Sequence, residues 1–241
     1  MFAEAIDALL AVHCTPAAVR AIESGGSARA LCGALTEAGF LDLMTSEADG
    51  GGGASWPELF EVVSLCGACA APVPLAQTLA ARALVHEPAR LPGGLLTFAP
   101  ATARADDGSL HARDVPAVRA ATHVVAAAAG GLLLLPVAEA ELVASGVHGS
   151  LAASLRWRRG AGEPLPAVLE GEHFLALGAL LHAALMAGAM TRAFDLTMAY
   201  ANERVQFGKS IGKFQAIQHQ LAVMAAHVAA ARIAAEAAFA S

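Results

Sequence analysis

The chain has 241 residues, of which 56% are hydrophobic and only 15% charged, and its formal net charge is −6 at pH 7. This length suffices for two or three compact pieces with a sizeable core, and the low charge content favours large buried interfaces, hence an oligomer. The negative charge gives no electrostatic reason to expect nucleic acid as a partner, and the basic stretch RWRRG at residues 156–160 is too small to change that expectation.

The N-terminal stretch carries Glu4 and Asp7 where a signal peptide needs positive charge, so we expect a cytoplasmic protein. The longest nearly uncharged run, Phe174–Met190, has 17 residues and contains His182. Because this run is at the lower limit for a bilayer span, we expect a buried core helix and no membrane span.

Residues 1–92 are expected to form an N-terminal helical domain. Apolar spacing predicts a short helix that ends at Gly39. Ser55 and Glu58 match the S-x-x-E capping box, which predicts the start of a second helix that ends by Pro72. The glycine-rich stretch between these two helices predicts a flexible loop, and AQTLAARALV predicts one more helix.

Residues 93–168 change to short apolar runs separated by turn residues, which indicates a small β domain in the middle of the chain. Asp107-Gly108 and Gly130-Gly131 lie between such runs, and each pair predicts a β-hairpin.

Residues 169–241 return to a helical pattern. The stretch Phe174–Asn202 is apolar on most faces, so we expect this helix to be buried in the centre of a bundle. A break at FGKSIG precedes a second long helix from about Lys213 to the last residue. No Gly, Asn or Pro ends that helix, so we expect the C-terminal helical domain to be incomplete.

Three chemical motifs fail on inspection. FGKS resembles the end of a phosphate-binding P-loop, but Glu203 stands where that motif needs a glycine. Cys66 and Cys69 have C-x-x-C spacing without the second pair of a zinc site, so we expect core thiols and no metal. No Ser, His and Asp cluster can be proposed from spacing alone, so a hydrolase is not expected.

A polar cluster between residues 200 and 224 offers groups suited to a dinucleotide. The guanidinium group of Arg204 lies where the helix pattern ends and suits bidentate contact with phosphate, and Phe207 follows on the turn. Gln215 and Gln218 share a helix face and can both donate and accept hydrogen bonds, as a purine or ribose edge requires. The alternative interpretation is a solvated helix-turn-helix corner whose polar groups face water.

The stretch AYANERVQFGKSIGKFQAIQHQLAVMAAHV resembles the flavin-binding helix pair of the acyl-CoA dehydrogenase family, whose pattern is Y-x-x-x-R-x-Q-F-G-x-x-I-x-x-F-Q-x-x-Q-H-x-L-A-x-M. The stretch LTEAGFLDLMTSEADGGGGASWPELFEVVSLCGACAAPVPL is similar to the family's helical first domain. The resemblance implies a mostly α fold with a small β domain, arranged as N-terminal helical, middle β and C-terminal helical parts.

The resemblance also implies FAD as cofactor and an acyl-CoA thioester as substrate, with electron-transfer flavoprotein as electron acceptor. Family members hold the adenosine diphosphate portion of FAD across a subunit interface. By the matching motif positions, Arg204, Phe207 and Gln215 would hold it here, with Gln206 and Gln218 as weaker neighbours. The implied assembly is a homodimer, a tetramer or a heteromer with a second acyl-CoA dehydrogenase-like chain, working in fatty acid or steroid degradation.

The departures from the family pattern concern catalysis. The middle region lacks the T-E-P-x-A-G-S-D-like loop and the W-I-[TS] strand that cover the flavin ring in relatives. One family position for the catalytic base falls on Leu177, Gly178 and Ala179, none of which is a carboxylate, and Glu170 and Glu172 lie several residues upstream. The catalytic residue therefore stays unknown, and two interpretations remain: a catalytic dehydrogenase without its last helices, or a non-catalytic subunit that completes the FAD site of a catalytic partner.

Overall fold

The computed structural model describes residues 2–85, 91–128, 131–144, 151–166 and 171–240, and for residues 144, 171 and 172 it describes the backbone alone. The described chain begins with five α-helices: α1 Phe2–His13, α2 Pro16–Glu23, α3 Arg29–Glu37, α4 Trp56–Ala68 and α5 Leu75–Leu84.

The predicted start of α4 is confirmed. The amide of Glu58 donates to Ser55 Oγ at 3.4 Å, and Glu58 Oε2 accepts from the amide of Ser55 at 2.9 Å, which is the reciprocal capping box. The predicted end of the preceding helix is also confirmed, because α3 ends at Glu37 and Gly39 adopts a left-handed φ of 74° two residues later.

The middle of the chain forms two four-stranded sheets, ordered β1-β4-β5-β8 and β2-β3-β7-β6. The strands are β1 Leu96–Ala99, β2 Ala103–Arg104, β3 Leu110–Val115, β4 His123–Ala128, β5 Gly131–Pro136, β6 Glu141–Ala144, β7 Ala153–Trp157 and β8 Glu163–Leu165.

Both predicted hairpins are confirmed as antiparallel pairs. Strands β2 and β3 pair on either side of Asp107-Gly108. Strands β4 and β5 pair with Ala128 opposite Gly131, while Gly130 itself lies outside the described residues. Strands β1 and β4 are parallel, because the chain crosses to the second sheet between them.

Two cores hold these parts together. One lies in the β region around the fully buried Trp157. The other joins the N-terminal helices, part of the β1-β4-β5-β8 sheet and the C-terminal helices α6 (Gly171–Glu203) and α7 (Gln215–Ala240). In this second core the rings of Phe98 and Phe174 lie 4.4 Å apart, and Phe239 near the end of α7 packs 5.5 Å from Phe60. The expected boundaries at 92/93 and 168/169 stay predictions.

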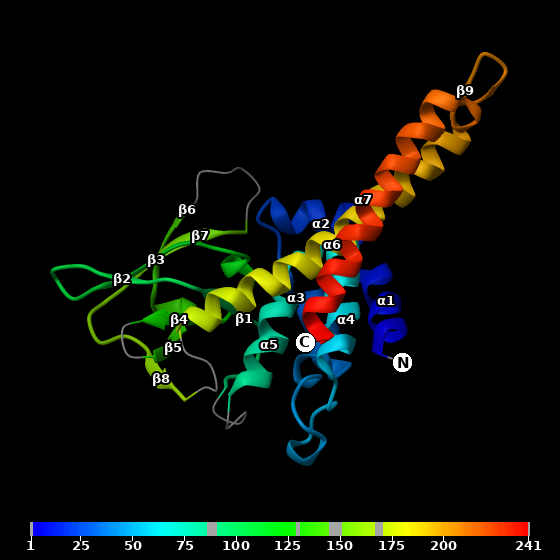
Figure 1. Ribbon diagram of the computed structural model, residues 1–241. Coiled ribbons are helices and arrows are strands. Elements are labelled where there is room, and N and C mark those ends of the chain that lie inside the picture. Colours follow the sequence, from blue (N-terminus) through cyan, green and yellow to red (C-terminus); the bar gives the residue numbers. More distant parts are fainter. Residues whose placement is uncertain (1, 86–90, 129–130, 145–150, 167–170, 241) are drawn as a thin grey trace.

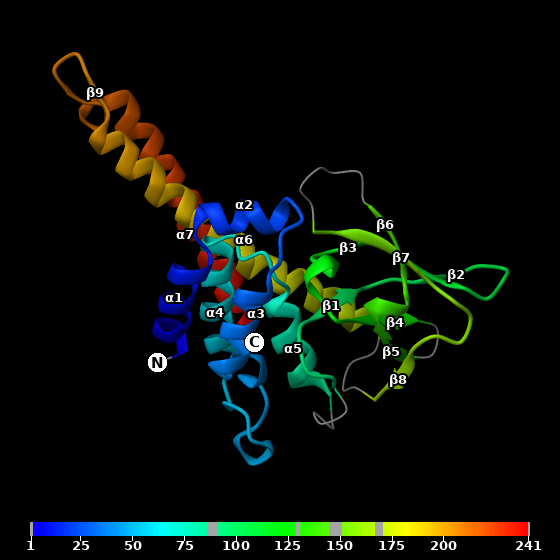
Figure 2. The same cartoon turned by 180° about the vertical axis from the view of Figure 1, so that it is seen from behind.

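Helix α6 is only half buried, so the expectation of a wholly buried central helix is wrong. Its first half carries the buried residues Phe174 and Leu181, whereas Leu196 and Tyr200 in the second half are 53% and 59% exposed. Figures 1 and 2 show the reason: beyond its crossing with α4, helix α6 leaves the body with α7 as its neighbour, and the two form a projecting hairpin.

The apolar surface of this hairpin is large. By length and composition alone, the segment His173–Glu203 and helix α7 could each cross a membrane, and the bent pair of α1 and α2 would add a third span if counted as one. Only 33% and 11% of the respective apolar windows are buried. Exposed apolar surface of this kind is typical of interaction sites. The expectation of no membrane span stays a prediction.

Candidate functional site

The residues predicted to hold a dinucleotide lie at the tip of the projecting hairpin (Figures 1 and 2). Helix α6 ends at Glu203, strands β9 Val205–Gln206 and β10 Lys209–Ser210 form a short antiparallel pair, and α7 begins at Gln215 after a 3₁₀ turn. The break predicted at FGKSIG is therefore a small β-hairpin between two helices.

The turn of this hairpin places an aromatic ring in solvent. Phe207 and Gly208 occupy its two central positions with φ values of 51° and 79°, and Gln206 pairs with Lys209 on either side. Two positive φ angles are typical of a two-residue hairpin turn, which glycine adopts freely, whereas a non-glycine residue there costs about 1–3 kcal/mol. Phe207 is also 91% exposed. A strained and solvated aromatic side chain is a candidate for ligand contact.

The backbone and one ring keep the tip in shape. The carbonyl of Arg204 accepts from the amide of Ile211 at 2.8 Å, which joins the end of α6 to the far side of the hairpin. The ammonium group of Lys209 lies 4.4 Å from the ring centre of Phe214, and Phe207 meets the same ring edge-on at 6.3 Å. Lys209 and Phe214 were absent from the predicted site; an aromatic residue immediately before α7 is the signal that could have identified this anchor.

All five predicted residues are exposed, and the structure brings them to the two sides of one tip. Arg204, Gln206 and Phe207 lie on the hairpin, and Gln215 and Gln218 on the first turn of α7. The four polar side chains form no hydrogen bond or ion pair with any residue that the structure describes. Their donors and acceptors are therefore free, which fits a ligand that carries phosphate and a purine.

The positions considered for a catalytic base lie on the first half of α6. Leu177 is buried, and the carbonyl of Gly178 is within hydrogen-bonding distance of His182 Nδ1, at 2.7 Å. Glu170 lies outside the described residues, and Glu172 belongs to the first turn of α6 with its side chain undescribed. The residues described at 177–179 offer no carboxylate.

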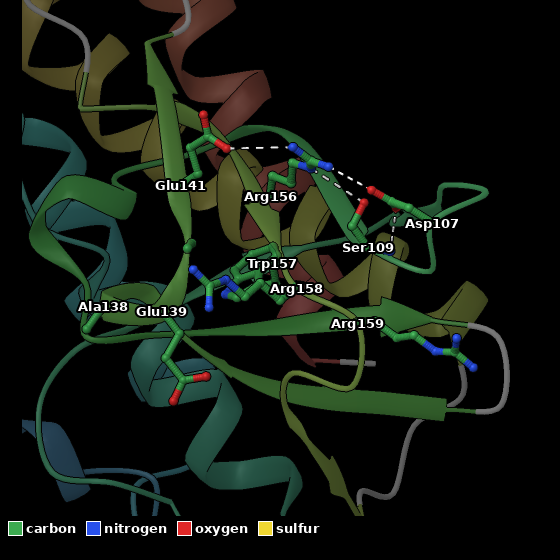
Figure 3. Close-up of a pocket in the computed structure, with 10 residues that line it drawn as sticks. Asp107, Ser109, Ala138, Glu139, Glu141, Arg156, Trp157, Arg158 and Arg159 are labelled. Atoms are coloured by element: carbon green, nitrogen blue, oxygen red, sulfur yellow. Dashed lines mark hydrogen bonds and ion pairs between the residues drawn. The ribbon is translucent and has the colours of Figure 1, made fainter.

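The basic patch RWRRG lines a polar pocket of about 520 Å³ in the β region (Figure 3). Arg156 Nη2 lies 2.7 Å from Asp107 Oδ2, and Arg156 Nη1 lies 3.9 Å from Glu141 Oε2. Hydrogen bonds from Ser109, and then from Arg156, lower the pKa of Asp107 to about 2. Arg156 is thus paired within a network that ties strands together. The absence of a nucleic-acid partner stays a prediction.

The comparisons with known proteins identify relatives of this chain. Residues 171–241 match the family model described as acyl-CoA dehydrogenase, C-terminal domain. The chain is 32% identical to acyl-CoA dehydrogenase IpdE2 of Mycobacterium tuberculosis over an alignment 261 positions long. This alignment covers 96% of this chain and 72% of the relative.

Solved structures share the fold. The structure titled Tcur3481-Tcur3483 steroid ACAD G363A variant superposes with a TM-score of 0.80 at 26% identity, covering 97% of this chain and 74% of that one. The ChsE4-ChsE5 complex from Mycobacterium tuberculosis superposes with a TM-score of 0.81 at 22% identity, covering 98% and 75%. The predicted mostly α architecture with a small β region is confirmed.

Proposed function

Because the chain belongs to the acyl-CoA dehydrogenase family, we propose that it is one subunit of a FAD-dependent enzyme that introduces an α,β double bond into an acyl-CoA thioester. The observation that carries this proposal is the free polar cluster at the tip of the α6–α7 hairpin. The tip extends away from the chain's own β region (Figure 2). The FAD that the tip binds therefore belongs to a neighbouring subunit.

Each residue of the tip has a distinct role in this proposal. The guanidinium group of Arg204 binds the pyrophosphate, for which its planar set of donors is suited. The amides of Gln215 and Gln218 bind the adenine or ribose edge, and Gln206 adds a donor beside the phosphate. The exposed ring of Phe207 covers the ligand. When bound, FAD supplies the acceptor for the hydride that leaves the β-carbon, while a carboxylate takes the α-proton.

We place the carboxylate base on a partner chain. Residues 177–179 lack a carboxylate, and this absence supports a subunit that completes the FAD site of a second, catalytic dehydrogenase-like chain. Two structural relatives, the Tcur3481-Tcur3483 steroid ACAD and the ChsE4-ChsE5 complex, are each named for two components, which gives further support. The alternative is a homomeric enzyme in which another residue of this chain, such as Glu172, serves as base.

The cofactor role is tested by FAD affinity. The chain is purified with a candidate partner, and bound flavin is titrated by absorbance and fluorescence in Arg204→Ala and, as a matched control, in Arg158→Ala on the β region. A charge-assisted contact to phosphate contributes about 1.5–3 kcal/mol of binding free energy. Its loss in Arg204→Ala therefore raises the Kd for FAD roughly ten-fold to over a hundred-fold. Unchanged affinity for FAD in Arg204→Ala would favour the alternative interpretation, in which the polar cluster is a solvated corner without a ligand.

The position of the base is tested by activity. The isolated chain with added FAD is assayed with an artificial electron acceptor on short, long and steroid-like acyl-CoA thioesters, and then again with partner chains. Without a positioned base the rate falls by about 10²- to 10⁴-fold. Turnover of about 1 s⁻¹ or faster by the isolated chain would contradict the partner-supplied base.

A further inference from the structure

A second site lies on the body of the molecule, where α1, α2 and the end of α4 meet the middle of α6. These elements enclose a pocket of about 770 Å³, within the size range of small-molecule sites. Its walls are largely apolar and include Leu10, Val19, Leu65 and Leu196. The wall from α6 comes from Thr191–Leu196, on the body side of the hairpin and apart from its tip.

Two thiols complete the apolar walls. Cys14 and Cys69 line the pocket from the ends of α1 and α4. Burial raises the pKa of Cys14 to about 11 and also raises the pKa of Cys69. Both groups are therefore uncharged thiols at neutral pH, which makes them packing surface for a ligand rather than nucleophiles.

Four charged residues are among those that line the pocket: Asp7, Arg20, Arg192 and Asp195. None of them forms an ion pair or hydrogen bond with the described part of the chain. Asp7 on α1 and Arg192 on α6 are opposite charges that line this one pocket from different helices. A head group of one sign would be attracted by one and repelled by the other.

We propose that this pocket binds a small amphiphile with an aliphatic body and a zwitterionic head group, its cationic part towards Asp7 and its carboxylate towards Arg192. The apolar walls take the aliphatic body, because burial removes it from water. The guanidinium group of Arg192 suits a carboxylate, and the carboxylate of Asp7 suits a cation. This site is separate from the proposed FAD-binding tip and does not depend on it.

The head group is tested by isothermal titration calorimetry with four probes that carry a ten-carbon chain: N-decyl-N,N-dimethylglycine, decanoate, decyltrimethylammonium and decanol. The three charged or zwitterionic probes are kept below their critical micelle concentrations, and decanol is kept below its solubility limit. We expect saturable one-to-one binding of the dimethylglycine probe, and at least ten-fold weaker binding of the other three. Equal affinity for all four probes would overturn the proposed head group. No saturable binding of the dimethylglycine probe would overturn the site.

Variants of Asp7 and Arg192 test the same assignment. Arg192→Gln and Asp7→Asn should each raise the Kd for the dimethylglycine probe about ten-fold, with unchanged circular dichroism, whereas the control Arg158→Gln should not. Unchanged affinity in both pocket variants would overturn the assignment. The bound probe should also slow maleimide labelling of Cys69, and unchanged labelling at saturation would place the probe elsewhere. Arg204→Ala should leave probe binding intact, so failure of the FAD proposal and failure of this one are distinguishable.

A lipid surface also presents a zwitterionic head group, with a phosphodiester in place of the carboxylate. Phosphatidylcholine vesicles are therefore sedimented with the protein, and we expect the protein to stay in the supernatant. Co-sedimentation that is lost in Arg192→Gln would assign the head-group contact to a membrane and overturn binding of a free small molecule.

Discussion

The crossing of α4 and α6 depends on two glycines, one on each helix, and each of them faces the backbone of the other helix. Replacing one of them is the sharpest test of the fold. A Cβ added at Gly188 would overlap the carbonyl oxygen of Ser64, and one at Gly67 would overlap the carbonyl oxygen of Leu185. Backbone atoms cannot rotate away as a side chain can. Gly188→Ala therefore forces the two helices apart.

The loss of stability in Gly188→Ala follows from the side-chain packing that is loosened when α4 and α6 move apart. Helix α4 presents fully buried Leu59 and Phe60 to the core, and α6 presents Leu181 and Ala184. Loosening such packing, together with the steric overlap, costs about 2–4 kcal/mol. Alanine is a better helix former than glycine by about 1 kcal/mol, which offsets part of this cost. The net loss is about 1–3 kcal/mol, or a melting temperature lower by about 3–10 °C for a chain of this size.

The measurement is thermal and urea unfolding followed by circular dichroism. Gly178→Ala is the matched control, because it makes the same chemical change on the same helix, where an added Cβ meets nothing within 4 Å. We expect this control to be stabilised by about 0.5–1 kcal/mol, from helix propensity alone. If Gly188→Ala is as stable as Gly178→Ala, the two helices do not pack through their backbones and the reasoning is refuted.

Two further predictions concern ionisation. The pKa of Asp107 is lowered from 3.8 to about 2 in the folded chain, so the stability that it contributes is present above pH 4 and is lost as the pH falls from about 4 to about 2. In Asp107→Asn the free energy of unfolding should therefore fall less steeply as the pH is lowered from about 4 to about 2. The same steepness as in the unmodified protein would contradict this. Burial raises the pKa of Cys66 to about 12, so at pH 8 Ellman's reagent should label this thiol only after denaturant is added. Rapid labelling in the native protein would show that Cys66 is accessible.

The features that the sequence determined by itself are those set by residues close together along the chain. Ser55 and Glu58 satisfy each other's backbone three residues apart, so the start of α4 could be predicted without the rest of the fold. The same holds for the hairpin at Asp107-Gly108 and for the grouping of Arg204 with Phe207 at a break between two helices, because turn chemistry acts within a few residues.

The tertiary structure decided which surfaces these elements meet. Apolar composition predicted that α6 is buried, yet burial depends on the neighbours that reach each face. Helix α6 crosses α4 near its middle, and beyond the crossing it leaves the body with α7 as its neighbour. The close crossing at Gly67 and Gly188 joins residues 121 positions apart (188 − 67), and no local pattern marks such a pair. Cys14 and Cys69 line one pocket for the same reason: packing free energy, rather than the propensity of neighbouring residues, brings together segments that are distant in sequence.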